Sequence, residues 1–422
     1  MNKVNELVYF DNAATTRIDP SVLEDMRPFL EHSYGNPSSS HQLGRMAKVA
    51  IDEARQRLAD LLHADSREII FTAGATEANN LVLLGLSEKY KNERPHFITS
   101  SIEHPSVLET CRHLERQGVA ISYLPCDQDG LIAPSDLAEA LRPNTKLISI
   151  MAANNVVGTV QPILEFAEIA NRAGILFHTD ASQAVGRIPL DLSSNKIDLL
   201  SCSAHKIYGP KGVGALYVRK GVQISPIIYG GGQEGGYRSG TENVAGIVGF
   251  GKAAQIANTV MADESVRLVS FREKLIETIT SIMPIARVVG HRWRRLPGHI
   301  SLRFSGLENE AIRVLLALDQ AGIAVSSGSA CSSNHVSDPS YVLQAMGYNP
   351  MQARGSLRIS LGRFNNELEC DYLLSVLPQI ISTLNPVTTK AHDIPSHFPT
   401  INMYENGITT AETINSYSGG TN

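Results

Sequence analysis

Segments typical of strands and of helices alternate from residue 66 to residue 221, and this alternation limits the fold more than any other feature. Helical sequence, as at 134–141 and 163–173, separates short apolar runs. Parallel neighbours need crossover connections, so this order predicts an α/β fold: a mostly parallel sheet with helices on both faces. The strand-like runs are 69–73, 96–99, 120–124, 146–150, 174–180, 197–200 and 214–218.

One lysine stands directly after the strand-like run 197–200. Lys206 follows Ser203 and His205, and a Gly-Pro break comes at 209–210. A lysine in such a place can form a Schiff base with pyridoxal phosphate, while hydroxyl and imidazole groups beside it hold the phosphate. The alternative interpretation is a surface lysine in a turn.

A carboxylate ends another strand-like run. Asp180 closes the apolar stretch that begins at residue 174, and it precedes Lys206 by 26 residues, enough for one crossover and a return strand. A carboxylate in this position can pair with a protonated pyridine nitrogen and make the cofactor ring an electron sink. By itself such an Asp is more often a cap or turn former, and the pairing with Lys206 carries the hypothesis.

A phosphate seat is predicted where the run 69–73 breaks at Gly74 and turns into an Ala- and Leu-rich helix. The backbone N–H groups of that first turn, with the Thr76 hydroxyl, would face an anion. An ordinary N-cap is the alternative. Ligands of parallel sheets lie at the carboxyl ends of the strands, which would bring Ala75 close to Asp180 and Lys206.

A single thiol lies within a run of small residues. Cys331 stands in the Ser- and Gly-rich stretch 325–334, which has little to bury and predicts a mobile loop with an exposed, reactive cysteine. An incidental cysteine in a loop is the alternative. A mobile thiol in the same chain as a Schiff-base lysine indicates chemistry on sulfur.

Together these motifs resemble the cysteine desulfurases, pyridoxal-phosphate enzymes of the class V aminotransferase superfamily, in the group whose reactive cysteine sits in an S-S-G-S-A-C loop. Similar blocks occur in order along the chain, at 9–16, 34–39, 103–108, 154–155, 238–243 and 357–364. The resemblance implies fold type I, with a mostly parallel seven-stranded sheet in a large domain at 15–262. It also implies a smaller α+β domain from 1–14 and 263–385, which carries the cysteine loop. A polar extension would follow at 386–422.

The resemblance also implies an activity and its residues. The chain would convert L-cysteine to L-alanine and a persulfide on Cys331, and would pass the sulfur to an acceptor protein. Iron–sulfur scaffolds, tRNA-thiolation proteins and DNA-phosphorothioation proteins are the candidate acceptors. A homodimer is expected, without a metal site. The implied residues are Lys206, Cys331 and His104 for catalysis; Ala75, Thr76, Asn155, Asp180, Gln183, Ser203 and His205, with Thr241 from the partner subunit, for the cofactor; and Arg358, Asn155 and Asn36 for the substrate.

Several points of this assignment stay open. His104 precedes Pro105 and could simply cap a helix. Val156, Gly235 and Ser332 depart from the family pattern, which puts the site wall, the dimer contact and the partner surface in doubt. The rival functions are a selenocysteine lyase or plain aminotransferase of the same fold, and a catalytically idle sulfur-relay scaffold.

Composition excludes other classes. The net charge of −5 gives no general footprint for nucleic acid, and the basic run 291–295 is interpreted as a solvated surface. No apolar run approaches the roughly 18 residues of a membrane span, and the N-terminus has no signal-like core. Five scattered cysteines form neither a disulfide framework nor a zinc pattern, and the other four should be inert. A reactive thiol needs reducing surroundings, so the expected compartment is the cytoplasm.

Overall fold

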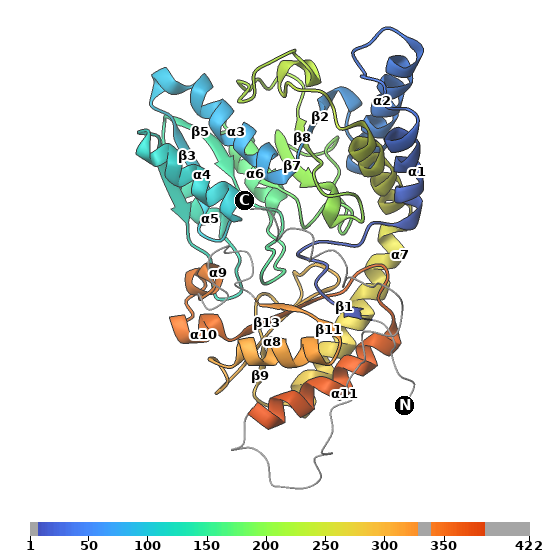
Figure 1. The fold of residues 1–422 in the computed structure, drawn as a ribbon. Coiled ribbons are helices and arrows are strands. Elements are labelled where there is room, and N and C mark those ends of the chain that lie inside the picture. Colours follow the sequence, from blue (N-terminus) through green and yellow to red (C-terminus); the bar gives the residue numbers. More distant parts are fainter. Residues whose placement is uncertain (1–6, 328–338, 385–422) are drawn as a thin grey trace, which may run out of the picture.

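The computed structural model describes residues 7–327 and 339–384, and its largest element is a seven-stranded sheet (Figure 1). β8 runs antiparallel to both of its neighbours, and the other four strand pairs are parallel. The predicted mostly parallel α/β sheet is therefore confirmed. The order is β2 (Ile69–Thr72), β8 (Gly214–Val218), β7 (Leu199–Ser203), β6 (Leu176–Asp180), β5 (Thr145–Ser149), β3 (His96–Ser100) and β4 (Ala120–Leu124).

Both faces of this sheet are buried, because successive side chains of a strand point to opposite sides. Ile69 and Phe71 of β2 belong to one core, and Ile70 between them belongs to the core on the other face. One face is covered by α3 (Ala75–Lys89) and α4 (Pro105–Arg116). The other face is covered by α2 (Gln42–Leu62), α5 (Pro134–Ala140), α6 (Ile163–Arg172) and the first half of α7 (Val244–Ile282), with α1 (Pro20–Glu31) packed against α7.

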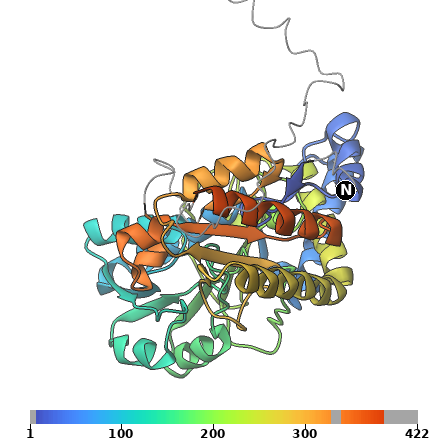
Figure 2. The ribbon, with the colours of Figure 1, turned by 90° about the horizontal axis from the view of Figure 1, so that it is seen from below.

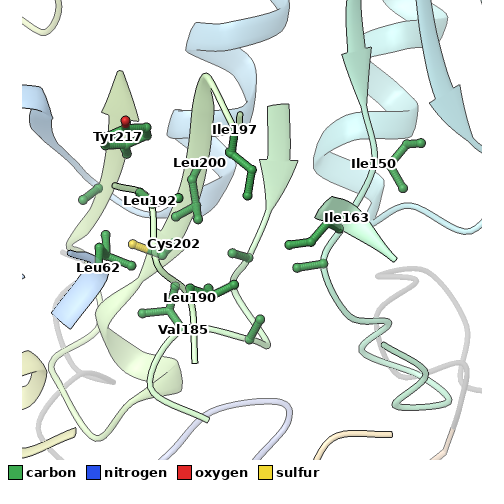
Figure 3. Close-up of a cluster of buried hydrophobic side chains, with 14 of the residues drawn as sticks. Leu62, Ile150, Ile163, Val185, Leu190, Leu192, Ile197, Leu200, Cys202 and Tyr217 are labelled. Carbon is green, nitrogen blue, oxygen red and sulfur yellow. The ribbon is translucent and has the colours of Figure 1, made fainter. Parts of the chain in front are cut away.

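The connection between β6 and β7 contains turns but no helix, although the two strands are parallel neighbours. Its apolar side chains cover the sheet in place of a crossover helix. Leu190, Leu192 and Ile197 are buried in the same core as Leu200 and Cys202, and Figure 3 shows them gathered there. Residues 181–198 thus form a short crossover whose apolar side chains pack directly against the sheet.

A second, four-stranded antiparallel sheet has its own core, and Figure 2 shows the helices packed around it. Its order is β12 (Ser326–Ser327), β13 (Ser356–Ser360), β10 (His299–Phe304) and β9 (Ala286–Val288). α8 (Ala311–Gln320), α11 (Glu367–Leu384) and the second half of α7 supply the rest of this core. Two short helices, α9 (Tyr341–Ala345) and α10 (Pro350–Arg354), precede β13.

Two parts of the chain join the sheets. α7 is 39 residues long, with Phe250 and Ala254 in the first core and Leu275 and Ile279 in the second. At the N-terminal end, β1 (Val8–Tyr9) pairs in parallel with β11 (Ile323–Ala324), so the segment that follows it runs from the second core toward the large sheet. The domain limits given above remain predictions, and the extension at 386–422 lies outside the described residues.

Among the helices of the described residues, not one combines the length and the apolar character that a bilayer crossing needs.

Candidate active site

The carboxyl ends of the parallel strands open into a cavity of about 930 Å³. β2, β3, β5, β6 and β7 all point toward this edge, so residues distant in sequence meet there. Nine of the predicted residues line the cavity: Ala75, Thr76, His104, Asn155, Asp180, Gln183, Ser203, His205 and Lys206.

Lys206 stands at the end of a single 3-10 turn, Ala204–Lys206, that follows β7 directly. Its Nζ donates hydrogen bonds to the carbonyl oxygens of Ala13 (2.7 Å) and Ala14 (2.8 Å). These carbonyls belong to the N-terminal segment, which contributes Ala14 and Thr15 to the cavity lining. The ammonium group therefore sits in the cavity wall, held by the backbone of a remote part of the chain.

Asp180 is the last residue of β6 and is 5% exposed. One carboxylate oxygen, Oδ1, accepts from the backbone N–H and the hydroxyl of Ser182, at 2.9 and 2.5 Å. The other, Oδ2, accepts from Asn79 Nδ2 at 2.7 Å. Three donors therefore fix the orientation of the carboxylate, which lines the cavity.

His104 both caps a helix and lines the cavity, so the two interpretations of the sequence hold together. Its Nδ1 accepts from the backbone N–H of Ser106 at 3.1 Å, at the start of α4, and lies 2.8 Å from the Ser106 hydroxyl. Burial lowers the pKa of His104; the Asp180 charge opposes this shift and the Lys206 charge adds to it. The imidazole is therefore neutral near pH 7.

The predicted phosphate seat is a helix N-terminus without a side-chain cap. α3 begins at Ala75 after Gly74, and within residues 7–327 and 339–384 no side chain caps its N-terminus. A Cβ on Gly214 of β8 would lie 2.6 Å from the Gly74 Cα, so only glycine lets this strand pass so close to the turn. Such a terminus attracts anions through its free N–H groups and dipole.

Polar groups surround this helix end. Ser203 and His205 lie beside it in the cavity wall, and Lys211, which was not predicted, lines the same cavity. His205 Nδ1 is hydrogen bonded to the Thr15 hydroxyl at 3.1 Å. Burial, with the charges of Lys206 and Lys211, lowers the pKa of His205 to about 4. The cationic groups at this end of the cavity are therefore the two lysines.

Gln183 and Arg358 carry buried polar groups near the cavity. Gln183 donates from Nε2 to Ala13 O at 2.9 Å, and its Oε1 is buried without a partner among the described residues. Arg358 is 1% exposed in β13 and does not itself line the cavity. Its guanidinium donates to Asp11 (2.8 Å) and to the carbonyl of Asn155 (2.9 Å), while Nε finds no partner in the described part of the chain.

Three predicted residues are not brought into the cavity of a single chain. Asn36 and Thr241 are exposed on loops, and neither lines the cavity. Cys331 lies outside the described residues, as does Ser332. The described chain stops at Ser327 in β12, whose neighbour Ser326 is in register with Arg358. It resumes ahead of Tyr341, whose hydroxyl donates to the carbonyl of Glu103 at 2.6 Å.

The structure describes two of the residues that depart from the family pattern, Val156 and Gly235. Val156 is 1% exposed; its N–H donates to Asn154 Oδ1, and its carbonyl accepts from His299 Nε2. Gly235 has φ +63, so the glycine suits a left-handed backbone in its loop.

The basic run 291–295 is not simply a solvated surface. Arg295 is 5% exposed and donates to the carbonyls of Val157 and Val289. These two bonds connect a loop that follows the large sheet's β5 to the end of β9 in the second sheet. Arg292 pairs with Glu273 and lies over the Trp293 ring. Only part of the predicted surface is therefore exposed.

Sequence reasoning missed a polar layer directly behind the cavity. Asn79 holds Asp180, Ser106 contacts His104, and Glu103 is fully buried between β3 and β5. Glu103 Oε1 accepts from Ser100 Oγ (2.6 Å) and from the Met151 N–H (2.9 Å). The available signal was the set of polar residues at or near the starts of α3 and α4, the two helices that follow strands at this edge of the sheet.

The chain resembles known proteins over most of its length. Residues 8–373 match the family described as aminotransferase class-V. Cysteine desulfurase IscS of Dictyoglomus turgidum is 48% identical over 381 residues, which cover 90% of this chain and 96% of that protein.

Two solved structures share the fold. One described as a NifS-like protein superposes with a TM-score of 0.83 at 39% identity, covering 89% of this chain and 100% of that one. SspA in complex with cysteine superposes with a TM-score of 0.72, also at 39% identity, and covers 84% of this chain and 98% of the other.

Proposed function

Since the chain belongs to the aminotransferase class-V family, and within it to the cysteine desulfurases, we propose that its cavity holds pyridoxal phosphate and takes sulfur from L-cysteine. The observation that carries the proposal is that Asp180, at the end of β6, and Lys206, just after the neighbouring β7, line one cavity with the N-terminus of α3. The enzyme is a cysteine desulfurase. Net, L-cysteine and a protein thiol become L-alanine and a protein persulfide.

The residues of the cavity fit this cofactor. An amine, a carboxylate and an anion seat are the three groups that it requires, and Lys206, Asp180 and the start of α3 supply them. The buried Gln183 Oε1 lacks a partner among the described residues, so a hydroxyl group on a bound ring would satisfy it. Bound there, pyridoxal phosphate supplies an electron sink that weakens bonds at the substrate's carbon atoms.

The chain's own groups then have separate tasks. Asp180, held by three donors, would keep a positive charge on the heterocyclic nitrogen. Ala75, Thr76, Ser203 and His205 would hold the phosphate, with Lys211 adding a positive charge. Lys206 would bind the cofactor and move protons at the substrate, and His104 would lie against the cofactor.

Arg358 is the proposed ligand of the substrate carboxylate. Its buried guanidinium has Nε without a partner among the described residues, and Asp11 and the Asn155 carbonyl hold it in place. A buried cation with a free donor favours a carboxylate strongly. Asn155 lines the cavity beside it, and Asn36 is proposed as a further contact.

Cys331 is the proposed sulfur acceptor of the first step. The other four cysteines are free thiols, and burial raises the pKa of each, to about 11 for Cys126 and about 12 for Cys111, Cys202 and Cys370. A thiol of such pKa is almost wholly protonated at pH 7 and reacts slowly. The flank of the Cys331 segment also lies in register with Arg358, beside the proposed substrate.

The test is a Cys331→Ser variant of the loaded enzyme, with Cys126→Ser as the matched control. We expect Cys331→Ser to change the cofactor's absorption on adding L-cysteine, as the wild type does, but to form alanine and sulfide at a rate lower by roughly 10³-fold. Cys126→Ser should keep normal turnover. Normal sulfide production from Cys331→Ser would assign the persulfide to another cysteine or favour a selenocysteine lyase or aminotransferase.

We also propose that the working unit is a homodimer. Exposed apolar side chains lie seven residues apart on α1 and three apart on α2, so each helix presents an apolar face that a second copy would cover. Thr241 and Asn36 are exposed on loops, where they could reach the partner's cavity. The apolar residues are Leu23, Leu30, Tyr34, Met46 and Val49.

Sedimentation velocity over a dilution series checks this proposal. We expect a dimer that Leu30→Glu with Met46→Glu splits into monomers, with activity lost in proportion to the dimer. A fully active monomer would contradict it. The acceptor protein and the cytoplasmic location remain proposals of the same kind, and an iron–sulfur scaffold is the first acceptor to test, because IscS proteins are among the relatives.

A further inference from the structure

A chain of hydrogen bonds behind the cavity connects Asp180 to His104. Asn79 Nδ2 donates to Asp180 Oδ2 (2.7 Å) and to Ser106 Oγ (2.9 Å). Ser106 Oγ lies 2.8 Å from His104 Nδ1, and the Ser106 backbone N–H donates to the same nitrogen at 3.1 Å. The chain thus joins β6, α3 and the first turn of α4.

The carboxylate determines the direction of the first bonds. Reversing the Asn79 amide would set its oxygen against Asp180 Oδ2, two acceptors at 2.7 Å, so Nδ2 must face Asp180. Its two hydrogens then go to Asp180 and to Ser106. The Asn79 oxygen is left buried without a partner among the described residues. An unmet acceptor costs about 1–3 kcal/mol, so stability alone does not explain this amide.

The next bond determines where the imidazole proton resides. Ser106 Oγ accepts from Asn79, and its single hydrogen then points to His104 Nδ1. Two donors meet that nitrogen, so Nδ1 carries no proton. Because burial keeps the ring neutral, the proton of His104 is on Nε2, the nitrogen with no contact to Ser106.

We propose that Asn79 and Ser106 are positioning residues that hold His104 in the Nε2-protonated tautomer and couple it to the Asp180 carboxylate. His104 then meets the substrate or cofactor as a hydrogen-bond donor. A proton on Nδ1 would break the bond from the Ser106 N–H and would force the Ser106 hydroxyl to turn its hydrogen away. The role toward the reacting atoms rests on the proposed function, but the tautomer is a property of the chain alone.

Two charged groups face His104 besides its own helix: Asp180 at the end of β6 and Lys206 after β7. Their effects on the protonated ring are opposite. The hydroxyl of Ser106 therefore has a separable effect, since the orientation in which it donates to Nδ1 favours the neutral ring. Removing it should raise the pKa of His104 by about one unit, the equivalent of one hydrogen bond.

The experiment is a pH titration of ¹⁵N-histidine NMR shifts, with the His104 signals assigned by His104→Gln. It is run on the loaded enzyme and on the protein without pyridoxal phosphate. We expect wild-type His104 to stay neutral and Nε2-protonated from pH 6 to 9. Ser106→Ala and Asn79→Ala should give mixed tautomers, Ser106→Ala should raise the pKa, and Ser106→Thr should restore the wild-type signals.

Thr110→Val is the matched control. The Thr110 hydroxyl bonds Asn80 Oδ1 (3.0 Å) and the Ser106 carbonyl (2.8 Å), so its loss weakens the same pair of helices without touching the chain of bonds. This variant should lose stability and keep the wild-type histidine signals. A proton on Nδ1 in the wild type, or equal shifts in Thr110→Val and Ser106→Ala, would overturn the proposal.

Failure of the proposed function has a different signature. If the enzyme forms no alanine from L-cysteine, the signals of the cofactor-free protein still decide the tautomer. In an active enzyme, the acidic limb of the kcat/KM profile should move upward by about one pH unit in Ser106→Ala. An unmoved limb would show that His104 does not act in the reaction.

Discussion

Two kinds of buried histidine occur in the large sheet, and they differ in what their second nitrogen meets. In the sheet interior, His178 bridges Ser149 and Ser201, and His96 bridges Thr145 and Ser122, with every ring nitrogen 2.8–2.9 Å from a hydroxyl. At the strand ends, His104 has Nδ1 bound on one side and the cavity on the other.

The surroundings differ in the same way. Around the strand ends, buried oxygens of Asn79, Glu103 and Gln183 have no partner among the described residues. In the sheet interior, every ring nitrogen of His96 and His178 has a hydroxyl partner, although burial lowers the pKa of both side chains to about 4. Burial and a lowered pKa are thus common to both regions, whereas a ring nitrogen that is left for the cavity distinguishes His104 from His96 and His178.

Replacing Lys206 should have the largest effect on activity. Lys206→Ala removes the group that binds the cofactor covalently, so we expect turnover to fall on the order of 10³-fold or more, with loss of the visible absorption band. Thermal unfolding of the cofactor-free protein should change little, because the two backbone carbonyls that accept from Nζ line a cavity where water can replace the amine. An unchanged spectrum would remove Lys206 from its role.

The buried Glu103, beside the strand ends, should make the free energy of unfolding depend on pH. Burial raises its pKa to about 8, against 4.5 for a free side chain. The folded state therefore holds a proton that the unfolded state releases, and stability is lost as pH rises from about 4.5 toward 8. The unfolding free energy should fall by roughly 3 kcal/mol between pH 5 and 8 from this group.

Glu103→Gln should lack this part of the fall. Urea unfolding at both pH values, for the wild type and the variant, measures the difference. Parallel pH profiles would mean that Glu103 is ionised in the folded protein and would weaken the contrast between the two regions.

Substitutions of the histidines in the sheet interior should lower stability and leave the reaction rate unchanged. Their effect should be the smallest of the three. His96→Leu removes a ring nitrogen from Thr145 and from Ser122, but Arg142 still bonds both hydroxyls. We therefore expect a loss of about 1–2 kcal/mol, below that of two fully orphaned groups. The kcat of the folded fraction should match the wild type, and a changed kcat would erase the distinction between the regions.

Much of this could be read from sequence, because the signals were local. The limits of β4 and β8 agree with the apolar runs, and Asp180 and Lys206 line one cavity at the strand ends, as expected. The helix-free crossover before β7 could not be read, since the pattern of Leu190, Leu192 and Ile197 becomes meaningful only against the sheet.

Contacts between distant segments were the other gap. Nothing in the sequence near Arg358 indicates that Asp11, 347 residues earlier, accepts from its guanidinium. Likewise, Asn79 reads as an ordinary helical residue until α3 is placed against β6. The roles of the residues at the site, and of Cys331 outside the described part, remain predictions.

The row through His178 has a further property. Each of its two nitrogens faces a hydroxyl, and a hydroxyl can either give or receive a hydrogen. The proton can therefore sit on either nitrogen if both serine hydroxyls turn together, with no heavy atom displaced. The hydrogens of this row therefore have two possible arrangements, and both give the ring the same number of hydrogen bonds. The carboxylate of Asp180, in contrast, allows only one direction of donation along the chain of bonds that ends at His104.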